Sequence, residues 1–533
     1  MKKFACILFI GFALFAVFRG GEMRMQNLET RAVHADEGEQ TWTFARLFLY
    51  DDYKYDPHGP HGPILYYWPL MFLNEDDEAT FDVKDLRETL LPIYPLTALC
   101  IFVIAAVMTR KFKSGKTPIV AAVAAGTFAT ILFAYSSMSQ IYSTYFVQEV
   151  FFALFSILFA AAFYFFFKKP SFALAVSLGV FAGLMQSTKE TAVFVYAACA
   201  VSVLIVFVLK TKAERADILH TYKNEGTLNL LKIFAAFILP AFAIYAALQS
   251  SFGANWRGVW DGIASYFIHF FDKSANPLHS KEFFYYFKLL AGQKADYIFF
   301  GETGIFAFSI LGTIFAFARR NHAAIFIALF AWSSLLILSL MTYKMPWLML
   351  SPLYALCILG GIAASEIMRI AFKPIWAASI LRISFMIFVM WTLFFQMNLA
   401  RTASVKYPSD PRNPFISVHT LKDSERLVTR VKNSVRVTEG ELNVLIAMKN
   451  SPWPLPWQFV RHGSTPDIVR DPKNLGDLSK YSIMIFDADF EPFFEGRFSD
   501  EVWLREYFGL RDNLLLRVLI RRDIFEKSIE LTN

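Results

Sequence analysis

Residues 34–42 read HADEGEQTW and residues 55–68 read YDPHGPHGPILYYW, and both stretches lie in a polar loop between two strongly hydrophobic runs. Their titratable candidates are His34, Asp36, Glu37, His58 and His61. Paired carboxylates and a histidine-rich turn stiffened by prolines are poor material for a hydrophobic core. We therefore interpret this loop, residues 19–88, as a candidate site at the edge of an apolar domain.

The composition of the chain indicates a membrane protein. Hydrophobic residues make up 56% of it and charged residues only 18%, against about 25% charged residues in soluble proteins. About eleven runs approach the roughly 20 residues that cross a bilayer. They lie near 4–18, 89–108, 117–135, 146–167, 171–188, 191–209, 228–249, 303–318, 323–341, 345–366 and 375–397. The first run lacks a small-residue cleavage site before Arg19, which favours an uncleaved anchor over a signal peptide.

Basic residues predict the orientation of these spans, because loops rich in Lys and Arg stay on the cytoplasmic side. They gather at every second connection, beginning with Lys2 and Lys3. Others are Arg110, Lys111, Lys113, Lys116, Arg319, Arg320, Arg369 and Lys373. We expect a multi-pass protein of the inner (plasma) membrane, with a cytoplasmic amino terminus and with residues 19–88, 250–302 and 398–533 outside. The net charge of +7 is then mainly a topology signal, and nucleic acid is not an expected partner.

After the membrane domain, residues 1–397, the composition changes to charged residues, prolines and short β-branched runs. The apolar runs at 442–448, 481–486 and 513–520 predict strands. Residues 499–508, SDEVWLREYF, predict a short helix that starts at Ser499, because acidic residues fill its first turn. Residues 398–533 are therefore predicted to form a small extracytoplasmic α/β domain.

Ionisable residues near the spans gather at the predicted outer ends. Such groups are costly in lipid and are functional candidates by default, although those at helix ends also anchor the protein at the interface. The candidates are Glu149, Lys189 with Glu190, Lys344, and a cluster of His279, Lys281, Tyr285 and Tyr286. Lys supplies charge and Tyr a hydrogen-bond donor, so the cationic candidates suit a phosphate. The alternatives are interfacial anchoring and, for Lys189 with Glu190, a local ion pair.

Taken together, these segments resemble the GT-C glycosyltransferases, which include protein O-mannosyltransferases, aminoarabinose transferases and oligosaccharyltransferase catalytic subunits. Within that group the sequence is most similar to the flippase-activity-associated family. The matching segments are HADEGEQ at 34–40, YDPHGPHGPILYY at 55–67, YFVQE ending at Glu149, STKETA at 187–192, HSKEFFYYF at 279–287, YKMPWL at 343–348 and SPWPLPWQFVRHG at 451–463. QFVRHG departs from the expected aromatic, Leu and Arg, which affects only the outer domain.

The resemblance implies inverting transfer of a sugar from a polyprenyl-phosphate donor to an extracytoplasmic lipid-linked glycan, polysaccharide or protein. Asp36 matches the catalytic Asp of the family and is expected to be the general base, with Glu37 orienting it or the acceptor. Glu149 matches a second carboxylate that binds acceptor or metal, a role also open to His58 and His61. Donor-phosphate candidates are Lys189, His279, Lys281, Lys344 and Tyr285.

Metal dependence, sugar, acceptor, carrier length and oligomeric state stay open at this point, since the oxygen and nitrogen ligands present could hold a divalent Mg, Mn or Zn ion and no cofactor is certain. The main alternative function is a flippase, or an accessory protein to a flippase, for lipid-linked sugars. The outer clustering of polar groups favours an enzyme, because transporters carry polar groups and broken helices near the midplane.

Overall fold

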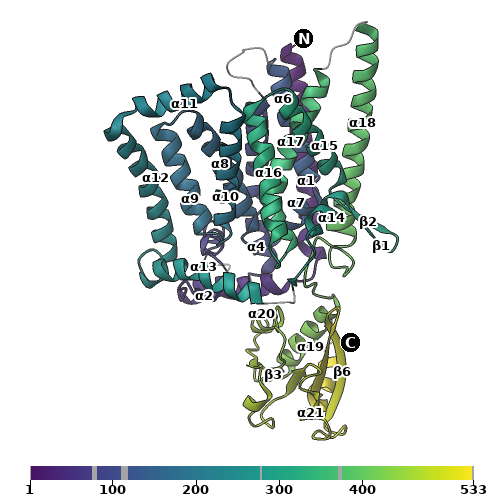
Figure 1. Cartoon of the computed structure of the whole chain (residues 1–533). Coiled ribbons are helices and arrows are strands. Elements are labelled where there is room, and N and C mark those ends of the chain that lie inside the picture. Colours follow the sequence, from purple (N-terminus) through teal and green to yellow (C-terminus); the bar gives the residue numbers. More distant parts are fainter. Residues whose placement is uncertain are drawn as a thin grey trace. The chain divides into compact units, whose positions relative to one another are not determined.

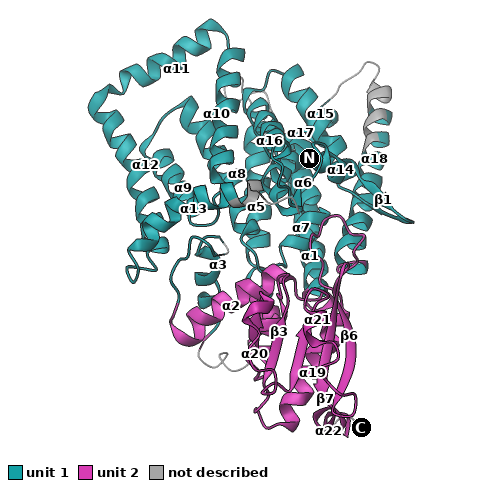
Figure 2. Cartoon of the chain, turned by 60° about the horizontal axis from the view of Figure 1, so that its bottom comes forward, with its two compact units in different colours: residues 1–27, 53–73, 87–406 teal, residues 28–52, 74–86, 407–533 magenta. Residues whose placement is uncertain are grey.

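A computed structural model describes residues 2–59, 61–74, 81–109, 118–275, 279–369 and 375–530. The basic residues Arg110, Lys111, Lys113, Lys116 and Lys373, which the orientation argument used, lie outside these ranges. The chain forms two compact units. Unit 1 holds residues 1–27, 53–73 and 87–406, and unit 2 holds residues 28–52, 74–86 and 407–533, as Figure 2 shows in teal and magenta.

Unit 1 is a bundle of apolar helices (Figure 1), and the described part of each predicted hydrophobic run lies mostly in one of them. Its long helices are α1 (Lys2–Thr30), α5 (Ile93–Thr109), α6 (Ile119–Ala134), α8 (Glu149–Lys168), α9 (Phe172–Gln186), α10 (Ala192–Leu209), α12 (Gly226–Gln249), α15 (Thr303–Ala318), α16 (His322–Leu340), α17 (Leu350–Met368) and α18 (Ile375–Arg401). Seven helical segments of the described chain are long and apolar enough to cross a membrane, while α6, α9 and α15 are shorter apolar helices. The polytopic helical prediction is confirmed.

Small residues let these helices approach closely. A side chain at Gly361 of α17 would overlap the carbonyl oxygen of Ala125 in α6, and one at Gly312 of α15 would overlap that of Leu359 in α17. Helices in lipid associate through such close backbone contact rather than through hydrophobic burial. Helix α17 is almost entirely buried and forms the centre of unit 1 (Figure 1).

Shorter elements connect the long helices. They are α3 (Ile64–Tyr67), η1 (Pro69–Met71), α4 (Val83–Thr89), α7 (Ser137–Tyr142), α11 (Lys212–Asn224), α13 (Arg257–Ala275), α14 (Tyr285–Ala291), the hairpin β1 (Gln293–Ala295) and β2 (Ile298–Phe300), η4 (Pro346–Met349) and η5 (Thr402–Lys406). Figure 1 shows α13 running across the direction of the bundle helices. It exposes Trp260 and Phe267, and Trp256 just before it is exposed too. Tryptophan is enriched at membrane interfaces.

Unit 2 contains a five-stranded sheet in the order β4 (Asp467–Val469), β3 (Val444–Ala447), β5 (Ile483–Phe486), β7 (Leu514–Arg521) and β6 (Trp503–Arg511). The first three strands are parallel, and β7 is antiparallel to both β5 and β6. The other elements of unit 2 are α2 (Ala35–Tyr50), α19 (Asp423–Val437), α20 (Leu455–Val460), η6 (Pro472–Asn474), α21 (Glu491–Phe494) and α22 (Arg522–Glu530). Both faces of β3 and β5 are buried, as is usual for parallel strands.

The predicted helix at 499–508 is wrong. Ser499 instead closes a turn, with its carbonyl accepting hydrogen bonds from the backbone N–H groups of Val502 and Trp503 at 3.1 and 2.9 Å. The chain then enters β6, which pairs with β7 along its whole length. The aromatic residues of this segment favour a strand when a partner strand is available, so the tertiary pairing overrides the helix-start signal.

Two boundaries differ from those drawn on the sequence. Helix α1 runs to Thr30, well beyond the hydrophobic run that ends near residue 18, so the polar loop begins later than residue 19. Helix α18 and η5 continue to Lys406 before unit 2 resumes at residue 407. Hydropathy locates the apolar part of a helix, whereas backbone hydrogen bonds carry the helix past it.

Candidate functional site

The Asp36–Glu37 pair occupies the first turn of α2, and His34 caps the helix. The Nδ1 atom of His34 accepts a hydrogen bond from the backbone N–H of Asp36 at 3.1 Å, while Glu37 Oε2 accepts one from the backbone N–H of His34 at 3.0 Å. His34 Nε2 lies 2.6 Å from the carbonyl oxygen of Ser417, to which it donates. This capping box satisfies backbone N–H groups that a helix start leaves without a helical partner.

Glu37 is buried and fully engaged. Its Oε1 atom lies 2.8 Å from an Nη atom of Arg31, and the side chains of Glu37 and Arg31 are 0% and 2% exposed. With one oxygen on Arg31 and the other on the cap, Glu37 holds the start of α2 in place. The structure therefore favours a structural role over the predicted catalytic role for this residue.

Asp36 points differently from its neighbour, with 45% of its side chain exposed. One turn later on the same helix, burial raises the pKa of Glu39 to about 7, and the charge of Asp36 adds to this shift. Burial lowers the pKa of Arg511, which the charge of Asp36 opposes. An Nη atom of Arg511 donates to the carbonyl of Trp453 at 2.8 Å. Unit 2 thus surrounds an accessible carboxylate with a second acid and a cation.

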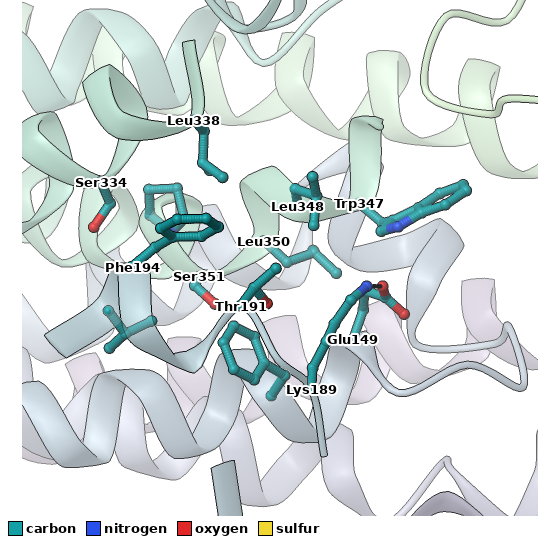
Figure 3. A pocket seen from close by; sticks show the side chains of 13 residues that line it. Glu149, Lys189, Thr191, Phe194, Ser334, Leu338, Trp347, Leu348, Leu350 and Ser351 are labelled. Atoms are coloured by element: carbon teal, nitrogen blue, oxygen red, sulfur yellow. Dashed lines mark hydrogen bonds and ion pairs between the residues drawn. The ribbon is translucent and has the colours of Figure 1, made fainter. Parts of the chain in front are cut away.

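Lys189 forms its ion pair with Glu149, so the alternative of a local Lys189–Glu190 ion pair is not what the structure shows. Both side chains are buried, at 3% and 7% exposure. Figure 3 shows the ammonium of Lys189 directed at the carboxylate of Glu149, with Trp347 beside them. The pair lines a small pocket, which has mainly apolar walls and the hydroxyls of Thr191, Ser334 and Ser351. Two sequence candidates from distant segments are therefore brought together.

Glu190 contacts two histidines. Its Oε2 atom lies 2.8 Å from His61 Nδ1, and its Oε1 atom lies 3.7 Å from His269 Nε2. The two imidazole rings are 5.6 Å apart between centroids. His58, in the same loop as His61, is exposed and does not belong to this group. Sequence reasoning missed His269, whose only signal was a titratable residue within an amphipathic aromatic helix.

The loop that carries His61 is fixed to the connection between α9 and α10. The backbone N–H of Gly62 donates to the carbonyl of Thr188 at 3.1 Å, and that of Ile64 donates to the carbonyl of Ser187 at 3.4 Å. A Cβ at Gly62 would overlap the carbonyl oxygen of Ser187. His61 itself has a φ of 59°, a conformation that non-glycine residues adopt at some cost.

The cluster at 279–285 meets the segment before η4. Ser280 and Tyr343 form an antiparallel bridge, and His279 and Tyr343 lie 5.4 Å apart between ring centroids. Lys344 is buried and donates from Nζ to the carbonyls of Met341 and of Lys281, the latter at 3.1 Å. Its ammonium thus holds the bridge together. Three other predicted phosphate ligands come from the same 279–285 segment. Of these, His279 and Tyr285 are partly buried, and Lys281 is exposed.

A large apolar groove opens between helices of unit 1. It is lined by residues of α8, α9, α10, α12 and α13: Phe159, Phe163, Ala182, Gly183, Gln186, Val193, Tyr196, Phe237, Ile238, Ala241, Phe242, Tyr245, Ile263, Tyr266 and Phe267. The Tyr266 hydroxyl donates to Gln186 Oε1. Burial raises the pKa of Tyr266, and the charge of Glu190 adds to this shift. Since Tyr266 also lies one helical turn before His269 on α13, the polar end of the groove adjoins the His61–Glu190–His269 group.

Comparison with solved structures gives the fold. The chain is similar to ArnT from Cupriavidus metallidurans, solved bound to undecaprenyl phosphate, with 14% identity and a TM-score of 0.59 over 97% of this chain and 98% of that one. It is also similar to the Archaeoglobus fulgidus oligosaccharyltransferase tethered with an acceptor peptide, with 13% identity and a TM-score of 0.52 over 98% and 77% of the two chains. No family model and no curated protein sequence matches it. Since ArnT and the oligosaccharyltransferase are both GT-C proteins, the chain has the GT-C fold.

Proposed function

We propose that this protein is an inverting membrane glycosyltransferase, which moves a sugar from a polyprenyl-phosphate donor to an extracytoplasmic lipid-linked glycan, polysaccharide or protein. The GT-C fold supports the reaction class, since one similar structure holds undecaprenyl phosphate and the other a tethered acceptor peptide. The sugar and the acceptor are left to experiment.

The observation that carries the proposal is the contrast between Asp36 and Glu37. Both were expected to take part in catalysis, Asp36 as the general base and Glu37 as an orienting group, yet Glu37 is buried against Arg31 while Asp36 keeps 45% of its side chain exposed. A general base must reach the proton that it removes. Asp36 alone of the pair meets this condition, and Glu39 and Arg511 modify the electrostatics around it.

The proposed reaction is a single displacement. An acceptor oxygen or nitrogen attacks the anomeric carbon as the bond from this carbon to the phosphate oxygen breaks, which inverts the configuration. Asp36 accepts the proton of the acceptor, and the polyprenyl phosphate leaves with the bonding electron pair. Cationic and hydrogen-bonding groups stabilise the negative charge that develops on the phosphate. His279, Lys281 and Tyr285 are the candidates for this role whose side chains are not buried.

The apolar groove suits the polyprenyl chain of the donor. Its walls are aromatic and aliphatic, and its polar groups are concentrated at Gln186 and the tyrosines. An isoprenoid needs an apolar surface without specific polar partners, whereas its phosphate needs a polar end. We assign the groove to the lipid tail.

The central experiment replaces Asp36 by Asn in the purified full-length protein and measures sugar transfer from a panel of radiolabelled polyprenyl-phosphate sugars to membrane glycolipids. Loss of a general base costs about 100-fold to 10,000-fold in rate. Asp52→Asn is the matched control, because Asp52 lies just after the end of α2, is 56% exposed and pairs with Arg46. Transfer at the wild-type rate by the Asp36 variant would remove the residue as base. Movement of lipid-linked sugar across vesicles by the wild-type protein without any transfer would establish the flippase alternative instead.

A second experiment tests the groove. Val193 and Val201 are both on α10 and are 41% and 42% exposed, but only Val193 lines the groove. Val193→Trp should fill the groove and raise the donor concentration needed for half-maximal transfer, while Val201→Trp should leave it unchanged. Equal effects of the two substitutions would argue against a lipid tail in this place.

The proposed orientation can be tested with a variant in which the four native cysteines are replaced. Single cysteines at Lys54 and Arg470 should react with an impermeant reagent from outside intact cells, and single cysteines at Arg215 and Arg320 should react only after the membrane is opened. Labelling of Arg215→Cys in intact cells, without labelling of Lys54→Cys, would reverse the topology and place the proposed site on the cytoplasmic side.

A further inference from the structure

His61, Glu190 and His269 come from three separate segments of unit 1, namely the loop before α3, the connection between α9 and α10, and helix α13. One candidate ligand atom from each lies within 4.8 Å of the others. Two imidazole nitrogens and one carboxylate oxygen are a ligand set that zinc uses in proteins. Neither the hydrophobic spans nor the capping of helices explains why these three groups converge.

We propose that His61, Glu190 and His269 form a binding site for a divalent transition-metal ion of the zinc type. Ligand atoms within 4.8 Å of one another need only side-chain adjustments to surround an ion at about 2 Å from each. Three protein ligands leave a fourth tetrahedral position for water or another oxygen ligand, as in open zinc sites. Each residue is only partly exposed, so the ion would be sheltered but still accessible.

Backbone hydrogen bonds fix the position of the loop that carries His61. His61 is held at a φ of 59° by the Gly62 to Thr188 hydrogen bond, which ties its loop to the segment that carries Glu190. Strained conformations of this kind persist where the surrounding structure fixes them, and they cluster at functional sites. His269 joins from the same helix as Tyr266, three residues away and on the same face.

The site adjoins the polar end of the groove, because Tyr266 lines the groove and lies one helical turn before His269 on α13. A bound ion would cross-link the loop, the α9–α10 connection and α13 at this end. Metal binding can be measured without donor or acceptor. Failure of the metal proposal and failure of the proposed transferase function are therefore separate results.

The test uses purified full-length protein that has been treated with a chelator and then titrated with Zn²⁺ against a chromogenic indicator, with bound metal counted by mass spectrometry. We expect one Zn²⁺ per chain. His61→Ala and His269→Ala should each weaken binding by more than about 100-fold, because even indirect partners of metal ligands cost about 10-fold to 100-fold. His58→Ala is the matched control in the same loop and should bind Zn²⁺ like the wild type.

Because an alanine variant can fail through misfolding, His269→Cys provides a second test. Cysteine retains a zinc ligand, so this variant should still bind one ion, and its Co²⁺ form should gain a thiolate-to-cobalt absorption that the wild type lacks. No bound Zn²⁺ in the wild type, or equal affinity in the wild type and both alanine variants, would overturn the proposal. The three residues would then be a hydrogen-bonded group only.

Discussion

We expect the Glu37→Gln variant to unfold at a markedly lower temperature than the wild type, although the substitution removes no group that takes part directly in the proposed reaction. The amide of Gln can still accept the hydrogen bond from the backbone of His34, since Gln serves in capping boxes as Glu does. What it loses is the charge opposite Arg31. The two side chains are 0% and 2% exposed and lie 2.8 Å apart, so the substitution removes a negative charge in direct contact with a buried guanidinium.

The magnitude follows from this burial. Breaking a buried ion pair by removing one partner typically costs about 3–5 kcal/mol, because the remaining charge stays desolvated. Asp36→Asn, one residue earlier and 45% exposed, should cost no more than about 0.5 kcal/mol, as is usual for exposed substitutions. At about 2 °C or more for each kcal/mol, the Glu37 variant should melt at least about 6 °C below the wild type.

Thermal unfolding in detergent, followed by tryptophan fluorescence, measures the difference. Replacing both partners, as Arg31→Leu with Glu37→Gln, should recover most of the loss, because no unpaired charge is then buried. If Glu37→Gln melts like the wild type but abolishes transfer, the structural role assigned to Glu37 is wrong and the catalytic one returns.

Further substitutions test local geometry and the titration of Glu39. Gly38→Ala places a Cβ 2.5 Å from that of Pro454 and should cost about 1–3 kcal/mol in the same melting assay. Gly62→Ala should push the His61 loop away from Ser187 and weaken Zn²⁺ binding, whereas Gly11→Ala, which meets no atom within 4 Å, should not. Burial raises the pKa of Glu39 from 4.5 to about 7, so its contribution to stability is full below about pH 4.5 and is lost as the pH rises through 7. Glu39→Gln should flatten that fall in a series of melting curves.

Much of the fold could be predicted from the sequence because each span is encoded locally. In lipid every backbone polar group must be satisfied within the helix, so a span appears as one long apolar run. The strands β3, β5 and β7 were predicted for a similar reason, since an apolar run of that length between turns suits a buried strand. Strand β6 was missed because its partner β7 supplies the deciding hydrogen bonds.

The contacts within the site could not be predicted, because they depend on loops that meet only after the helices pack. The sequence marks Glu149 and Lys189 as separate candidates, and their ion pair joins α8 to the α9–α10 connection. The sequence identifies His61 as a candidate but does not indicate its contacts, since Glu190 and His269 lie in distant segments. The sequence shows which ionisable residues lie next to apolar spans, where such residues are rare. The packing of the helices determines which of these residues contact one another.

Adjacent residues in particular were misleading as pairs. Asp36–Glu37 and Lys189–Glu190 each look like one functional unit in the sequence. Successive side chains on a helix do not face each other, and residues three or four apart do. In α2, accordingly, Glu37 turns to Arg31 while Asp36 shares its surroundings with Glu39. In the connection between α9 and α10, which is not helical, Lys189 contacts Glu149 while Glu190 contacts His61. A charged dipeptide beside a membrane span therefore indicates two different environments, and each residue of the pair needs its own test.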